Sequence, residues 1–135
     1  MKALFIFVIL VLAALVSLAV CKELEGHKRT QLACMIEANV SEPEIEKFRN
    51  SGLNATEANA NIKCMLKCMM EKRDLFQNGV FDGEKAFTEF IKSPENKGQE
   101  AGIKEAINVC KTEKGANDCD TAFKITMCLH EFKSQ

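Results

Sequence analysis

Residues 61–73, NIKCMLKCMMEKR, carry two cysteines four positions apart in a segment with helical periodicity. Side chains at positions i and i+4 lie on the same face of a helix, so Cys64 and Cys68 point in one direction. Each is therefore expected to pair with a cysteine elsewhere in the chain. A separate apolar face carries Ile62, Met65, Leu66, Met69 and Met70. A helix that is tied down on one face and apolar on another can wall a cavity.

The first 21 residues have the three parts of a secretory signal. Lys2 supplies the positive charge, residues 3–16 are apolar, and small residues follow at 17–19. Cleavage after Cys21 is favoured because it leaves six cysteines, whereas cleavage after Ala19 would leave a seventh. No later segment approaches the roughly 20 apolar residues of a membrane span. We therefore predict a signal peptide over residues 1–21 and a secreted, extracellular domain over residues 22–135 without stable membrane insertion.

The composition of the predicted mature chain excludes several classes of function. Removal of Lys2 with the signal changes the formal net charge from −1 to −2, so no basic patch is expected for nucleic acid. The chain has no Trp and no Tyr, which are the usual platforms for stacking bases or sugars. At about 114 residues, it is the size of one small domain.

The mature region predicts an all-α domain of about six short helices. Ser41 and Glu44 form a capping box, and Asn54 is expected to cap the central helix, which ends near Lys72. Asp82 is expected to cap the fourth helix. No segment shows a strand pattern of comparable quality. The other helices are expected over residues 24–39, over residues 42–49, over a stretch that carries Ile103 to Cys110 and ends at Lys114 before Gly115, and over residues 118–132.

The spacing of the cysteines restricts how they pair. Cys119 and Cys128 are nine residues apart in one predicted helix, which places them about 13 Å apart along the axis and on opposite sides. They cannot bridge to each other, and the same-face pair of the central helix is disfavoured, but several other pairings remain open. A zinc site is rejected because an oxidising compartment favours disulfides and because His27 and His130 lie at the two ends of the mature chain.

Six cysteines separated by 29, 3, 41, 8 and 8 residues resemble the signature of the insect odorant-binding proteins, the pheromone-binding and general odorant-binding family. The resemblance covers the whole predicted mature chain. It implies three disulfides, Cys34–Cys68, Cys64–Cys119 and Cys110–Cys128. These bridges would tie the central helix to the first and last helices, and the last helix to the fifth.

The same resemblance implies a carrier that encloses a small hydrophobic molecule between helices, with no cofactor. The ligand is expected to be an ester, alcohol, aldehyde or fatty acid of medium length, held mainly by burial. The alternative is a non-olfactory carrier or a protein-interaction factor on the same scaffold. Thr88 and Thr126 are the nearest polar candidates inside. The expected ligand-binding residues are Leu66, Met70, Leu75, Phe81, Phe87, Phe90, Ile103, Ala106, Ile107, Ala122, Ile125 and Leu129.

Catalytic motifs are missing from the sequence, so we predict that the protein is not an enzyme. The cysteines are assigned to disulfides and the histidines are terminal, which leaves no nucleophile beside a base. Only residues 129–135 follow the sixth cysteine, a tail that we expect to be too short to reach deep inside a cavity. Asn39 and Asn54 begin glycosylation sequons, but both lie where helix caps are wanted.

Overall fold

The computed structural model describes residues 2–133 and divides at Ala33 and Cys34 into two compact units. The first unit is the larger part of helix α1 (Lys2–Glu37), which runs without a break through the apolar segment, although a helix start was predicted near residue 24. α1 spans the predicted cleavage site after Cys21. The cleavage itself stays a prediction. None of the described helices is long and apolar enough to cross a membrane.

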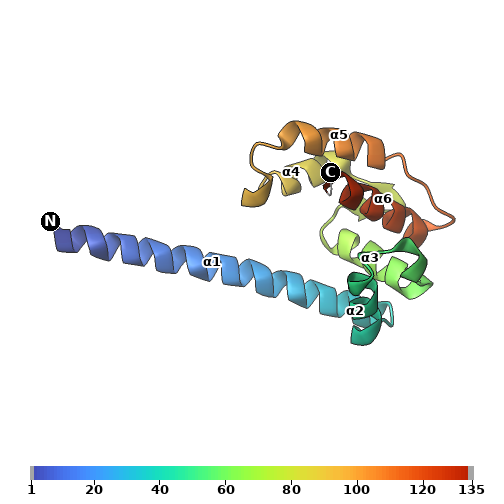
Figure 1. The fold of residues 1–135 in the computed structure, drawn as a ribbon, viewed down its shortest axis with the longest axis horizontal. Coiled ribbons are helices and arrows are strands. Elements are labelled where there is room, and N and C mark those ends of the chain that lie inside the picture. Colours follow the sequence, from blue (N-terminus) through green and yellow to red (C-terminus); the bar gives the residue numbers. More distant parts are fainter. Residues whose placement is uncertain (1, 134–135) are drawn as a thin grey trace. The chain divides into compact units, whose positions relative to one another are not determined.

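The second unit is helical, as predicted (Figure 1). After the last turn of α1, the elements are α2 (Glu42–Asn50), the 3-10 turn η1 (Ala55–Glu57), α3 (Ala60–Lys72), β1 (Phe76–Gln77), β2 (Val80–Phe81), α4 (Gly83–Phe90), the 3-10 turn η2 (Pro94–Asn96), α5 (Glu100–Cys110) and α6 (Asp118–Lys133). α6 packs against both α3 and α5, and α5 packs against α4. α5 ends at Cys110, so the predicted end at Lys114 is wrong by four residues.

The predicted cap of the central helix is wrong by five residues. Asn54 Oδ1 accepts from the Thr56 backbone N–H at 3.0 Å and so begins η1 rather than α3. Asn59 is the cap of α3, and its Oδ1 accepts from Ile62 N–H at 2.9 Å. Both asparagines satisfy helix N-terminal donors, and the sequence alone did not distinguish the short turn from the long helix.

A short antiparallel hairpin lies between α3 and α4, in addition to the predicted helices. Phe76 pairs with Phe81 and Gln77 with Val80 across a two-residue turn. Asn78 and Gly79 both have positive φ, at 51° and 76°, as a type I′ turn requires. The turn was recognisable from Asn-Gly, but strands of two residues are too short to show alternation.

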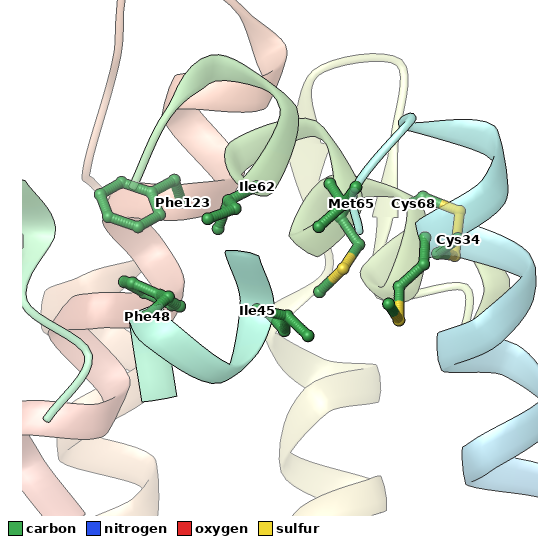
Figure 2. Packing of buried hydrophobic residues seen from close by; sticks show 9 residues of the cluster. Cys34, Ile45, Phe48, Ile62, Met65, Cys68 and Phe123 are labelled. Atoms are coloured by element: carbon green, nitrogen blue, oxygen red, sulfur yellow. A yellow bond between two sulfur atoms is a disulfide. The ribbon is translucent and has the colours of Figure 1, made fainter. Parts of the chain in front are cut away.

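Buried apolar side chains form two regions around α3 and α6. The first region joins the end of α1, α2, α3 and Phe123 of α6 (Figure 2). Phe48 and Phe123 lie with ring centroids 6.3 Å apart. The second region lies between the end of α3, the hairpin, α4, α5 and the end of α6, with Leu75, Phe76 and Ile107 buried. The central helix, α3, therefore contributes side chains to both buried regions.

The three disulfides implied by the family resemblance are confirmed. They join Cys34 to Cys68, Cys64 to Cys119, and Cys110 to Cys128. Among the described residues, only Cys21 is a free cysteine, and it is exposed. Cys64 and Cys68 thus link α3 to two different helices, α6 and α1.

An ion pair next to one disulfide joins α3 to α6. Lys63 Nζ donates to Asp120 Oδ1 at 2.6 Å and lies 5.1 Å from the centroid of the Phe123 ring. The Lys63 hydrogen bond, followed by the Ala116 backbone N–H, holds the pKa of Asp120 below its ordinary value of 3.8. The folded state therefore favours the ionised carboxylate.

We expect this pair to make stability fall at acid pH. Because the pKa of Asp120 is lowered on folding, its contribution is complete above the ordinary value and is lost as the pH falls through the lower, folded value. Asp120→Asn should therefore lower the melting temperature at pH 7, and the difference from the unmodified chain should shrink below about pH 3.8. Thermal unfolding followed by circular dichroism across this range checks it. An equal difference at every pH would contradict this assignment.

Candidate ligand cavity

A cavity of about 630 Å³ lies in the second unit, where the ends of several helices meet. It is bounded by the end of α4, by η2, by one face of α5 and by the last turns of α6. Its volume is in the range of about 300–1,000 Å³ that is typical of small-molecule sites. The apolar side chains that line it are Phe90, Ile103, Ala106, Leu129 and Phe132.

Local sequence explains why the helices leave space at this position. α4 ends at Phe90, and Pro94 begins the short turn η2, because proline lacks the N–H that a helix interior needs but is tolerated in a first turn. The chain then turns at Gly98, with φ of 83°, into α5. Gly102 lines the cavity and has no side chain, and a Cβ built there would meet nothing within 4 Å. Part of the open space thus results from a glycine on the inner face of α5.

Polar side chains of both signs surround the apolar lining. Lys133 Nζ lies 3.4 Å from Glu95 Oε1, so an ion pair links the end of α6 to η2. Lys92 donates to Glu89 at 2.6 Å, and this hydrogen bond is the main cause of the lowered pKa of Glu89. The polar lining residues are Arg73, Glu89, Ser93, Glu95, Asn96, Gln99, Glu105, His130 and Lys133. The site is therefore suited to a ligand with an apolar body and a polar end.

The structure gathers most of the predicted ligand-binding residues in this region. Phe90, Ile103, Ala106 and Leu129 line the cavity directly. Leu66 instead packs against the first buried region, on the other side of the unit's core. The remaining seven lie in the second region, where they pack around or behind the lining: Met70, Leu75, Phe81, Phe87, Ile107, Ala122 and Ile125.

The sequence analysis missed much of the polar lining. Thr88 is exposed and donates to Glu84 O at 3.0 Å, while Thr126 is partly buried and donates to Ala122 O at 2.8 Å. Neither lines the cavity, so the expectation that they were the nearest polar groups is wrong. Phe132, the last residue of the predicted final helix, was not included among the expected ligand-binding residues, although Leu129 of the same helix was. Its helical spacing of three from Leu129 was the available signal.

Within residues 2–133, no three His, Cys, Asp or Glu side chains gather as ligands of one ion. The features present are an apolar lining, a mixed-charge rim and three disulfides that hold the helices around it. Together they define a class of protein, the disulfide-linked helical carrier of small hydrophobic ligands.

Residues 21–132 match the model of the PBP/GOBP family, and the chain belongs to this family of odorant-binding proteins. The general odorant-binding protein 56a of Drosophila melanogaster is 32% identical over 112 residues, which cover 83% of this chain and 75% of the relative. The recognition made from the cysteine spacing is therefore confirmed. Members of the family are ligand-binding carriers, and this chain is a carrier of small hydrophobic molecules.

Solved structures give the same result. The fatty acid binding protein OBP56a from the oral disk of the blowfly Phormia regina is 28% identical, with a TM-score of 0.67, and the match covers 84% of this chain and 93% of that one. The odorant-binding protein dmelOBP28a of Drosophila melanogaster has a TM-score of 0.68 at 16% identity, covering 84% and 93%. The second likeness concerns the fold alone.

Proposed function

We propose that the chain is secreted after loss of residues 1–21 and carries an amphipathic ligand in the cavity between α4, α5 and α6 through aqueous fluid. The observation that supports this most strongly is the cavity itself, which combines an apolar lining with polar side chains around it. No catalytic step is assigned to it.

A fatty acid is the first candidate ligand. The blowfly relative is described as a fatty acid binding protein, and the cavity of this chain offers an apolar lining for an alkyl tail. Burial at about 25 cal/mol per Å² of apolar area favours the tail, less the costs of association. The rim holds Arg73 and Lys133, but also Glu89, Glu95 and Glu105, so it does not form a purely positive anchor for a carboxylate.

A competition assay tests this proposal. A hydrophobic fluorescent probe is titrated into the secreted protein and is then displaced by fatty acids and by alcohols of the same chain length. We expect saturable probe binding, displacement by both series, and an affinity that rises with chain length because each added CH₂ contributes up to about 0.8 kcal/mol. Absence of saturable binding would contradict the carrier proposal. Displacement by alcohols alone would contradict the fatty-acid assignment.

A further inference from the structure

Two sequons occupy different structural settings in the second unit, although both are exposed at the asparagine. They are Asn39-Val-Ser41 and Asn54-Ala-Thr56, and neither has proline in the middle. We propose that Asn54 is an N-glycosylation site of this protein and that Asn39 is not. The proposal rests on the secretion proposed above, because the modification is made in the secretory pathway.

The cap made by Asn54 is compatible with a glycan. Asn54 Oδ1 accepts from the Thr56 backbone N–H at 3.0 Å and from Thr56 Oγ1 at 2.9 Å. The nitrogen Nδ2, to which a glycan is attached, has no hydrogen-bond partner among the described residues. Capping and glycosylation can therefore occur at the same asparagine, because the cap uses Oδ1 and the glycan would be attached to Nδ2.

The transfer itself leaves the capping atom unchanged. Nδ2 loses a proton and bonds to the first sugar of a lipid-linked oligosaccharide diphosphate, and the lipid diphosphate is the leaving group. The product is a secondary amide whose Oδ1 still accepts hydrogen bonds. Residues 54–56 are all exposed, so the three positions of the sequon are accessible together.

The other sequon is built into the fold. Asn39 lies in the turn after α1 with a positive φ of 54°, and Val40 N–H donates to Met35 O at 2.8 Å in the same turn. Val40, the middle residue, is buried in the first region at 7% exposure. The hydroxyl of Ser41 donates to Glu44 Oε2 at 2.6 Å within the capping box. In the folded chain, packing therefore holds the middle residue of this sequon and the capping box holds the last, whereas residues 54–56 are all exposed.

The position of Asn54 also separates the glycan from the ligand. Neither Asn54 nor any residue of η1 lines the cavity, and the printed side-chain contacts of Asn54 are with Thr56 of η1. Glycosylation should therefore leave ligand affinity unchanged, and a variant without the glycan should bind the ligand as the glycosylated protein does.

Intact-mass spectrometry of the full chain expressed in insect cells and collected from the medium tests the proposal. We expect one glycan that peptide-N-glycosidase removes, converting Asn54 to Asp. Asn39→Gln and Thr56→Ser should keep the glycan, while Asn54→Gln and Thr56→Ala should lose it. Probe affinity should be equal with and without the glycan.

Three outcomes would overturn the assignment. Secreted protein without a glycan, or with its glycan at Asn39, contradicts it directly. A chain that stays in the cells with residues 1–21 attached contradicts the proposed secretion and, with it, the modification. The probe assay on the same material reports on the carrier function separately, so a carrier without a glycan and a glycoprotein without ligand binding are distinguished.

Discussion

Replacing Cys64 and Cys119 together by serine is expected to lower the free energy of unfolding by about 4 kcal/mol. This disulfide spans 55 residues, the longest separation of the three, and joins α3 to α6. A long closed loop restricts the unfolded chain most, so its removal releases the most entropy on unfolding. Both cysteines are half-buried, so the serine side chains cause little additional packing damage.

The matched control is the double replacement of Cys110 and Cys128, which are 18 residues apart. The loop-closure part of its expected cost is about 3 kcal/mol, because the loop is shorter, and serine at the fully buried position of Cys110 adds a packing cost to this value. Urea unfolding of the oxidised proteins, all lacking residues 1–21, measures both values. Equal stability of the unmodified protein and the Cys64/Cys119 variant would show that this bridge does not restrain the fold.

Replacing Gly102 by leucine should reduce ligand affinity by at least about tenfold, which corresponds to about 1.4 kcal/mol of binding free energy. Gly102 lines the cavity, and the leucine side chain would occupy volume that the ligand needs. The backbone does not oppose the change, since a Cβ meets nothing within 4 Å. Leucine is also a better helix former than glycine by up to about 1 kcal/mol, so α5 should not be weakened.

Two variants of α5 separate blocking of the cavity from other effects. Gly102→Ala supplies the helix propensity with little added volume, and Lys104→Leu places the same leucine at an exposed position outside the lining. Both should bind the fluorescent probe as the unmodified protein does. Unchanged binding in Gly102→Leu, with the fold intact by circular dichroism, would place the ligand elsewhere.

The disulfide pairing was predictable from the family resemblance. Helix geometry alone disfavoured a bridge between Cys64 and Cys68 and left several other pairings open. The boundaries of α3 were less accessible, since Asn54 and Asn59 are both good caps and only the tertiary path shows which one precedes the helix. The hairpin at Asn78-Gly79 was recognisable as a turn but not as paired strands.

The cavity was predictable only in part. Its apolar residues follow helical periodicity, so Phe90, Ile103, Ala106 and Leu129 were found. Its polar rim arises where η2 meets the end of α6, as in the Lys133–Glu95 ion pair, and these segments lie 38 residues apart in the chain. No local sequence pattern predicts that two segments so far apart in the chain lie side by side. Leu66 shares the apolar arc of α3 with Met70, yet the helix passes between two buried regions and leaves them on different sides.

The division of α3 between the two buried regions gives the most direct test of where the ligand binds. Met35 and Met65 are buried in the first region, whereas Met70 packs in the second with Leu129, a residue of the cavity lining. In a titration of ¹³C-methyl-methionine-labelled protein with a fatty acid, followed by NMR, the account predicts that the Met70 methyl signal shifts and saturates while those of Met35 and Met65 stay in place. Saturable shifts of Met35 and Met65 with an unmoved Met70 would contradict it.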